Sequence, residues 1–427
     1  MNRYERYKDS GIPWLGEMPE HWEIKPLKFS INNISHKVES QLSNLRYFGL
    51  ENIESFTGRL LLDIELESEG IANEFQENDV LFGKLRPYLA KVHLSRLNGL
   101  VSTEALVFRA SNAVNPKFLF YFCVSSDFID AVNGTTFGSK MPRASWDNIG
   151  NFRMLIPSLK EQTAIAHYLD TKLGEIDALI DKQQTLLEKL AEQRTAVITH
   201  AVTKGLNPAA PMKNSGVEWL GDVPAHWEVS PFKLVMNSII DYRGKTPEKT
   251  NSGVFLITAR NIKNGIIDYT LSQEFIDEDN YEEVMRRGLP KLGQVLMTTE
   301  APLGEVAQID RTDVALAQRV LKFDGKKDKL DNRFLKYFIL SKAFQASLYK
   351  FATGSTALGI KSERLSYLKS LLPPVTEQIA IADYLDQETA KIDRLCDTVN
   401  QTIGRLKEYR TALITQAVTG KIKVTDE

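Results

Sequence analysis

The sequence predicts an α+β protein made of two similar halves, in which two globular domains are separated by two long antiparallel helices that pair as a coiled coil. Three observations predict this fold class. Two kinds of segment recur along the chain, the longer one carries apolar residues at helical spacing, and the stretches between them mix strand-like and helix-like patterns. An internal repeat with approximate two-fold character therefore organises the chain.

The repeat has a short part and a long part. Residues 8–28 and 213–233, which we call the tryptophan segments, are identical at 12 of 21 positions at an offset of 205. Residues 156–206 and 372–422 are identical at 23 of 51 positions at an offset of 216. Agreement of this extent does not arise by chance, so we expect the two copies to have the same structure and the same task.

The long repeated segments are predicted to be helices over 160–203 and 376–419. Apolar residues recur by sevens, with Gln183 as the exception in the first copy, which is the period of a coiled-coil seam. About 40 residues at a rise of 1.5 Å make a helix of roughly 60 Å. Gly174 and Gly404 lie inside the helices and are candidate positions for a break. The predicted seam consists of Leu169, Ile176, Leu190 and Val197 in the first copy and Leu385, Ile392, Leu406 and Leu413 in the second.

The blocks between the repeats resemble each other only faintly and are predicted to be mixed α and β domains. Strand-like runs such as 79–82, 106–108 and 254–257 alternate with Gly, Asn and Pro turns. Each block closes with an amphipathic stretch that we expect to be helical, at 116–131 and 332–350. The predicted division is residues 1–155 (first tryptophan segment and first domain), 156–206 (central helix), 207–371 (linker, second tryptophan segment and second domain) and 372–427 (C-terminal helix).

Motifs of catalysis and of cofactor binding are missing from the sequence. Gly244-Lys245-Thr246 is similar to the end of a phosphate-binding loop, but Ile239 stands where that loop needs a glycine. The chain has no HExxH, no CxxC and no GxGxxG after a strand, so we expect no metal, nucleotide or S-adenosylmethionine site on it. A nuclease built on a loose acidic cluster stays open as an alternative.

The remaining special residues have simple structural interpretations. Cys123 and Cys396 align with isoleucines of the other half, so both are expected to pack as small apolar side chains. His21 and His226 are expected to cap or bridge the turns of the tryptophan segments. The longest apolar run, 118–124, is far shorter than the about 20 residues of a membrane helix. We therefore expect a cytoplasmic protein without a membrane partner.

Basic character is local. The net charge of −2 gives no global argument for nucleic acid, but the stretch 83–96 holds four Lys or Arg residues and no acid. Lysine and arginine contact phosphates, and arginine reads guanine in the major groove, so such loops are candidates for a DNA surface. The candidate DNA-binding residues are Lys84, Arg86, Lys91, Lys140 and Arg143 in the first domain and Arg243, Lys245, Arg260 and Lys361 in the second.

With these features in place, the chain resembles the DNA-specificity subunit of type I restriction–modification systems over essentially its whole length. Three duplicated motifs carry the resemblance. They are SG(I/V)xWLG…P(E/A)HWE at 10–23 and 215–228, the EQxAIAxYLD helix starts within 157–170 and 373–386, and the RTA(V/L)IT(H/Q)AVT helix ends at 194–203 and 410–419.

The resemblance implies a non-catalytic subunit whose two domains are target recognition domains. Each would read one half of a bipartite, asymmetric target in double-stranded DNA, and the helices would set the spacer. The implied partners are two methyltransferase subunits and restriction (motor-nuclease) subunits, which would bring S-adenosylmethionine, ATP and Mg. The alternative from another class is a cytosolic scaffold whose domains bind proteins rather than DNA, and neither the basic loops nor the family motifs favour it.

Overall fold

The protein is described by a computed structural model that covers residues 3–66, 70–242, 247–354 and 358–424. The chain folds into two compact units. Unit 1 contains Met1–Gln184 and Asn400–Glu427, and unit 2 contains Thr185–Val399. Each unit holds one tryptophan segment, one globular domain and a part of each long helix. The α+β class is confirmed, while the division into four segments, which gives each helix a segment of its own, stays a prediction.

The two long helices are α4 (Leu159–Lys204) and α8 (Val375–Val418), within one residue of the predicted bounds. Ser158 precedes α4, and its hydroxyl accepts a hydrogen bond from the backbone N–H of Glu161 at 3.3 Å, which caps the first turn. Both helices are continuous, so the expected break at Gly174 or Gly404 is wrong. Both glycines are exposed with open space beside them, and a helix tolerates the propensity cost of about 1 kcal/mol that each brings.

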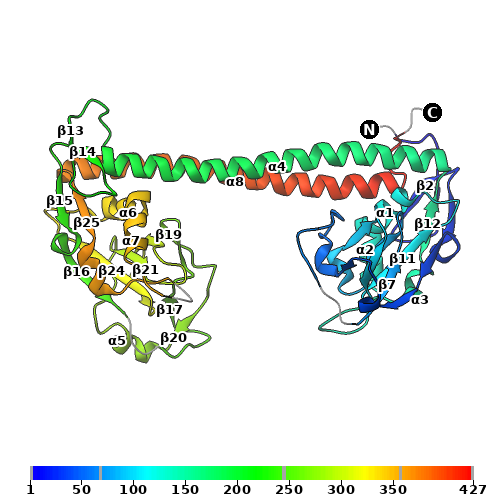
Figure 1. Ribbon diagram of the computed structural model, residues 1–427, viewed down its shortest axis with the longest axis horizontal. Coiled ribbons are helices and arrows are strands. Elements are labelled where there is room, and N and C mark those ends of the chain that lie inside the picture. The colour runs from blue at the N-terminus through cyan, green and yellow to red at the C-terminus, as the bar shows by residue number, and fades with distance from the viewer. Residues whose placement is uncertain (1–2, 67–69, 243–246, 355–357, 425–427) are drawn as a thin grey trace. The chain divides into compact units, whose positions relative to one another are not determined.

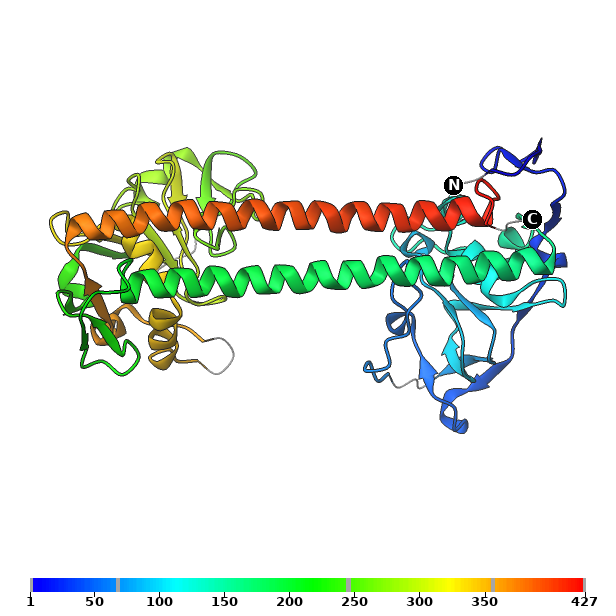
Figure 2. The ribbon, with the colours of Figure 1, turned by 90° about the horizontal axis from the view of Figure 1, so that it is seen from above.

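In each unit a segment of α4 lies alongside a segment of α8 that runs in the opposite direction (Figures 1 and 2). Val197 and Leu406 of the predicted seam are only half-buried, and Ile198 and Ile403 are buried near them. A helix of 3.6 residues per turn drifts away from a strict seven-residue stripe, which explains the displacement. The other seam residues are buried, namely Leu169, Ile176, Leu190, Leu385, Ile392 and Leu413.

The first domain is built on two four-stranded sheets. One has the order β5-β7-β10-β6, and the other has the order β4-β11-β8-β9. Phe48 and Phe75 belong to the buried cluster that the sheets share. The strands are β4 (Ile31–Ile34), β5 (Lys37–Glu39), β6 (Tyr47–Phe48), β7 (Ile71–Phe75), β8 (Val80–Gly83), β9 (Val92–Leu94), β10 (Gly99–Ser102) and β11 (Ala105–Ala110), and the helices are α1 (Pro116–Val124), α2 (Ser126–Asn133) and α3 (Trp146–Ile149).

The second domain has one four-stranded sheet, ordered β16-β24-β21-β22, and two smaller sheets, ordered β20-β17-β23 and β18-β19. Its core contains two buried clusters, one of them continuous with the helix residues Leu385 and Val202. The strands are β16 (Met236–Asp241), β17 (Val254–Ile257), β18 (Ile262–Lys263), β19 (Ile266–Ile267), β20 (Phe275–Ile276), β21 (Val295–Thr298), β22 (Val306–Gln308), β23 (Val314–Leu316) and β24 (Val320–Gly325), and the helices are α5 (Tyr281–Val284), α6 (Asn332–Leu340) and α7 (Lys342–Lys350).

The tryptophan segments form matching small sheets in the two units. Each contributes a two-stranded hairpin and one strand that pairs with the strand leading into the long helix. Trp22 and Trp227 are fully buried in these arrangements. The hairpins are β1 (Tyr7–Asp9) with β2 (Glu17–Pro19) and β13 (Met212–Asn214) with β14 (Asp222–Pro224), and the pairs are β3 (Glu23–Pro26) with β12 (Arg153–Ile156) and β15 (Glu228–Pro231) with β25 (Lys369–Leu372).

The stretches 116–131 and 332–350, predicted as one helix each, are interrupted. Ser125 separates α1 from α2 with ψ 143°, and Ser341 separates α6 from α7 with ψ 146°. Each serine hydroxyl donates to a carbonyl three residues earlier, at 2.7 Å and 2.6 Å. A serine competes with the helix for backbone groups in this way, and the hydrophobic spacing alone did not reveal it.

Candidate nucleic-acid interface

Two basic stretches of the first domain, far apart in sequence, meet on one surface. The backbone N–H of Arg86 donates to the Pro142 carbonyl at 2.7 Å, and the N–H of Ala144 donates to the Lys84 carbonyl at 2.9 Å. An isolated β-bridge joins Leu85 to Arg143. The loop after β8 and the turn at 137–143 therefore form a single structure, which we call the first loop pair (residues 84–88 and 137–144).

Cationic and apolar side chains are exposed together on the first loop pair. Arg86, in a left-handed conformation with φ 50°, and Lys140 are exposed, and Lys84 is half-buried. Phe137 is 62% exposed, and Tyr88 and Met141 are exposed as well. Lysine and arginine can neutralise phosphates, and rings can stack on bases or wedge between them, so this surface has the chemistry of a DNA contact.

Two of the predicted DNA-binding residues have partners inside the domain. The Lys91 ammonium donates to the Leu50 carbonyl at 2.6 Å, and the Arg143 guanidinium donates to a Glu104 carboxylate oxygen at 3.0 Å. Both side chains thus stabilise the loops of the first domain. Lys84, Arg86 and Lys140 are the stronger candidates for DNA.

The second domain has an equivalent loop pair, which the structure describes at residues 299–303, 353–354 and 358–361. A bridge joins Glu300 to Gly359, and the N–H of Ile360 donates to the Thr299 carbonyl at 3.0 Å. Ala301, with φ 48°, precedes a proline as Arg86 does. The bridged arrangement therefore resembles that of the first loop pair, although the Ala301–Pro302 peptide bond is cis, and Thr299, Ala301 and Gly359 replace the basic residues.

The basic residues predicted for the second domain are distributed differently. Lys361 is exposed at the end of the second loop pair, and Arg260 is exposed on the loop that leads into β18. Arg243 and Lys245 lie outside the described residues. Arg319, which was not predicted, pairs with Glu300 at 2.7 Å beside the loop pair.

The repeated EQ dipeptide connects three parts of each unit. In unit 1, Glu161 accepts a hydrogen bond from Trp22 Nε1 at 3.2 Å and is hydrogen-bonded to His21 Nε2 at 2.9 Å. Burial would raise the pKa of Glu161, but the hydrogen bonds from His21, Trp22 and Ser158 outweigh it, so this carboxylate has a pKa below its usual value. In unit 2, Glu377 binds Trp227 Nε1 at 3.1 Å and His226 Nε2 at 2.8 Å. The bridging role predicted for the two histidines thus has a specific partner.

The glutamine that follows binds the globular domain. Gln162 is fully buried, donates to the Ala113 carbonyl at 3.0 Å and accepts from the Asn115 N–H at 2.7 Å. Gln378 is also fully buried, donates to the Lys329 carbonyl at 2.8 Å and accepts from the Asp331 N–H at 2.8 Å. The two glutamines therefore make the same bonds in the two units.

Three further repeated positions, a tyrosine, an aspartate and a threonine, complete these contacts. The Tyr121 hydroxyl donates to Asp170 at 2.7 Å, and the Tyr337 hydroxyl donates to Asp386 at 2.5 Å. The Thr415 hydroxyl of α8 accepts from the Ser126 N–H at 3.2 Å in unit 1. In unit 2, the Thr199 hydroxyl of α4 accepts from the Lys342 N–H at 2.9 Å. We call this set of contacts, in each unit, the domain–helix joint.

Residues of the joint were missed because the identical positions of the repeat suggested helix pairing and partner docking. The available signal was the identity of polar residues such as Gln162 and Gln378, which a coiled coil alone does not need. Among the described residues, no group of three or more His, Cys, Asp or Glu side chains could hold a metal ion. No helix in the described ranges is long and apolar enough to cross a bilayer.

Comparison with known proteins fits this architecture. The family model of the type I restriction modification DNA specificity domain matches residues 69–189 and 224–404, well over half of the chain. The protein belongs to this family, which makes it a specificity subunit of the type I restriction–modification class.

Similarity to individual members extends over nearly the full length. The chain is 25% identical to the type I restriction enzyme MjaVIII specificity subunit of Methanocaldococcus jannaschii, covering 95% of this chain and 94% of that protein. It is 21% identical to the EcoKI specificity subunit of Escherichia coli K12, covering 95% and 90%. A chain from a structure of the type I R-M system superposes with a TM-score of 0.73 at 18% identity, covering 95% of this chain and 99% of that one. The HsdS subunit from Thermoanaerobacter tengcongensis gives 0.53 at 18% identity, covering 97% and 100%.

Proposed function

We propose that this chain is the DNA-reading subunit of a type I restriction–modification complex and that each globular domain reads one half of a bipartite, asymmetric target. The observation that carries the proposal is the contrast between the joints and the loop pairs. The helix residues of the joints are the same in both units, whereas the loop pairs share a bridged arrangement and differ in side chains. Two matching domain–helix joints that hold two domains with different exposed loops are what a target with two unlike half-sites requires.

In this proposal the first loop pair contacts DNA through Lys84, Arg86 and Lys140. The second domain uses Arg260, Lys361 and, outside the described residues, Arg243 and Lys245. Lysine and arginine at these places would neutralise phosphates, and Phe137 would lie against bases or sugars. The second loop pair, with Thr299 and Ala301, would read its half-site with fewer charges and closer backbone approach.

The helices α4 and α8 would set the spacer between the half-sites and dock two methyltransferase subunits, and the seam residues would hold the pair together. Catalysis would belong to the partners. The methyltransferase subunits would bring S-adenosylmethionine, and restriction subunits would bring ATP and Mg. The complex would act on DNA in the cytoplasm. A protein-binding scaffold is the weaker alternative, since the family match and the cationic loop pair favour DNA.

Exchange of one domain tests the proposal. Residues 29–155 are replaced by the equivalent block of another family member, with the joint residues kept. Sites methylated in cells carrying the hybrid and its methyltransferase partners are then sequenced. We expect one half-site to change and the other to stay. A hybrid that changes both half-sites, or neither, contradicts the assignment of one domain to one half-site.

A further inference from the structure

Two arginines occupy equivalent places near the ends of the long helices. Arg194 lies on α4 and Arg410 on α8, 216 positions apart, and each opens the repeated RTA motif. Arg410 is only 8% exposed, which is unusual for an arginine without a dedicated partner. The surroundings of both residues show what they bind.

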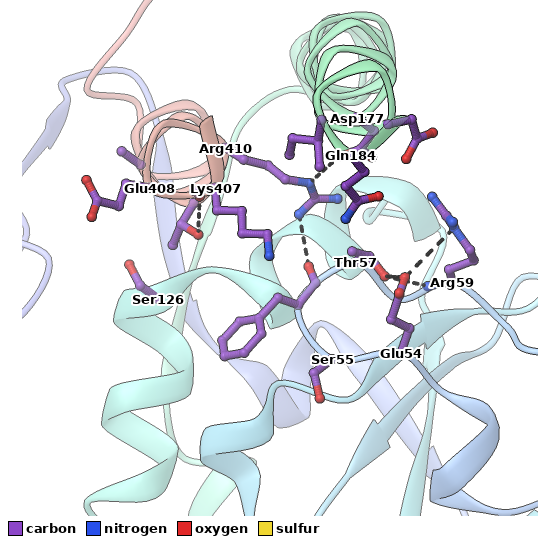
Figure 3. Close-up of a pocket in the computed structure, with 15 residues that line it drawn as sticks. Glu54, Ser55, Thr57, Arg59, Ser126, Asp177, Gln184, Lys407, Glu408 and Arg410 are labelled. Carbon is purple, nitrogen blue, oxygen red and sulfur yellow. Dashed lines mark hydrogen bonds and ion pairs between the residues drawn. The ribbon is translucent and has the colours of Figure 1, made fainter. Parts of the chain in front are cut away.

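In unit 1 the Arg410 guanidinium binds two elements besides its own helix (Figure 3). Its Nε donates to the Asp177 carboxylate of α4 at 3.0 Å, and its Nη1 donates to the backbone carbonyl of Phe56 at 3.0 Å. The guanidinium borders a cavity of about 730 Å³ that Gln184 and Lys407 also line. One side chain thus connects α8, α4 and the first domain.

In unit 2 Arg194 makes the same set of contacts. It pairs with Asp393 of α8, and its Nη2 donates to the backbone carbonyl of Asn264 at 3.2 Å. Asp393 and Asp177 are also 216 positions apart. In both copies an arginine binds an aspartate of the facing helix and a backbone carbonyl of the domain, although different guanidinium nitrogens donate. The domain sequences that supply the carbonyls have diverged.

The accepting carbonyls lie at equivalent turns of the two domains. Phe56, with φ 65°, lies between the bridged residues Ile53 and Leu60, and Asn264, with φ 54°, lies in the turn between β18 and β19. Residues other than glycine rarely adopt this conformation.

Both hairpins start from a fully buried asparagine. Asn52 donates to the carbonyls of Leu61 and Ile64, and Asn261 donates to those of Asp268 and Ser272. Each turn is therefore a rigid platform that presents a carbonyl to the arginine.

We propose that Arg194 and Arg410 are positioning residues that lock each domain to the helix pair and thereby keep the spacing and orientation of the half-sites. The proposal rests on the proposed function. A guanidinium can donate hydrogen bonds to a carboxylate and to a carbonyl that lie in different directions, because its N–H groups point outward from a planar group. Lysine keeps the charge but concentrates its donors on one atom. Arg410→Lys and Arg194→Lys therefore remove the geometry of the lock and keep its charge.

The test uses the full-length chain purified with the methyltransferase subunits of its own system. Hydrogen exchange without DNA is measured for the hairpins at 53–60 and 262–267. In Arg410→Lys we expect exchange to rise about tenfold at 53–60, the factor that corresponds to one lost hydrogen bond to a charged group, and to stay unchanged at 262–267. Arg194→Lys should give the reverse pattern. Lys407→Ala, which lines the same cavity as Arg410, is the matched control and should resemble the wild type.

A second measurement connects the lock to spacing. Duplexes with the selected half-sites and spacers one base pair longer or shorter are bound to each variant. We expect the wild type to prefer one spacer, and the lysine variants to bind the neighbouring spacers with a discrimination about tenfold weaker, without a change in the preferred bases.

The outcomes separate the two proposals. If the wild type shows no sequence-specific binding, the proposed function fails, while hydrogen exchange still tests the lock. Unchanged exchange in both lysine variants overturns the lock. Raised exchange with an unaltered spacer profile overturns its role in spacing. If Arg410→Lys fails to fold, Arg194→Lys decides, because that side chain is 20% exposed and its loss leaves less of the core unpaired.

Discussion

The first loop pair and its counterpart in the second domain share a bridged arrangement and differ in their side chains. Arg86 and Ala301 both have a left-handed conformation before a proline, and both loops are bridged to a turn 58 or 59 residues further along the chain, Leu85 to Arg143 and Glu300 to Gly359. The first presents Arg86, Lys140 and Phe137 to solvent, while the second presents Ala301 and an internally paired Glu300. The joints behind them differ in almost nothing. The attachment of each domain to the helices is thus kept alike, while the exposed loops differ.

Under the proposed function, this difference separates the choice of bases from the position of the half-sites. Changes in the loop pairs are then expected to alter the preferred bases without moving the domains. Changes in the joints and helices are expected to move a domain without altering the bases that it prefers. The predictions that follow act on one side of this division at a time, in order of decreasing effect.

Shortening the helices should move the half-sites and leave their bases unchanged. Deleting residues 182–185 from α4 and the equivalent 398–401 from α8 removes about 6 Å and about 40° of helical rotation. B-DNA rises about 3.4 Å per base pair, so the preferred spacer should shrink by one or two base pairs and binding to the original spacer should be lost. Selection from a duplex pool with variable spacers measures this. An active variant that keeps the original spacer would show that the helices do not set the distance.

Reversing charge in the first loop pair should weaken binding without shifting the spacer. For Lys84→Glu with Arg86→Glu we expect the slope of log affinity against log salt to fall by about one for each lost phosphate contact. Fluorescence anisotropy over a salt series measures it. Lys91→Met is the matched control, because the Lys91 ammonium donates to the Leu50 carbonyl. The control should reduce stability and leave the slope unchanged, whereas equal slopes for all three proteins would assign the loop pair to ordinary surface.

Removing a joint glutamine should destabilise its own unit. Gln162→Ala removes a fully buried side chain and its hydrogen bonds to the Asn115 N–H and the Ala113 carbonyl, which costs about 1 to 3 kcal/mol. Differential scanning calorimetry should show a lower transition for unit 1, and Gln378→Ala should do the same for unit 2. His167→Ala, at an exposed position further along α4, serves as control. A loss no larger than that of the control would mean that the glutamine does not hold the domain.

Acid should release the first tryptophan segment, and this is the smallest effect that we expect. The pKa of Glu161 lies below its ordinary 4.5, so its carboxylate contributes stability that is present above pH 4.5 and lost as the pH falls through the folded-state value. The difference in unfolding free energy between the wild type and Glu161→Gln should therefore be constant near neutral pH and shrink in acid. A difference that grows as the pH falls would contradict the assigned direction.

Sequence patterns predicted the features that depend on periodicity and repetition. The bounds of α4 and α8 followed from the repeat, and the β8 and β17 strands followed from short apolar runs. The helix breaks at Ser125 and Ser341 were missed, because a local hydroxyl-to-carbonyl bond overrides an amphipathic pattern. The local concentration of basic residues identified the loops at 84–86 and 140–143. Their contact with each other depends on the tertiary fold, which charge patterns do not reveal. The internal use of Lys91 could not be read from composition, since a lysine that binds a carbonyl and one that faces solvent look alike in a sequence.

The hydrogen-bond partners of side chains on α4 and α8 have an evolutionary consequence. Gln162, Gln378, Arg194, Arg410, Thr199 and Thr415 all bind main-chain atoms of the domains. Peptide N–H and carbonyl groups are the same whatever side chain a residue carries. Mutations can therefore accumulate in the domains while these attachments persist, provided that the backbone path is kept. Under the proposed function, such a chain can acquire new target sequences by substitution or recombination while the hydrogen bonds that attach the domains to the helices stay the same.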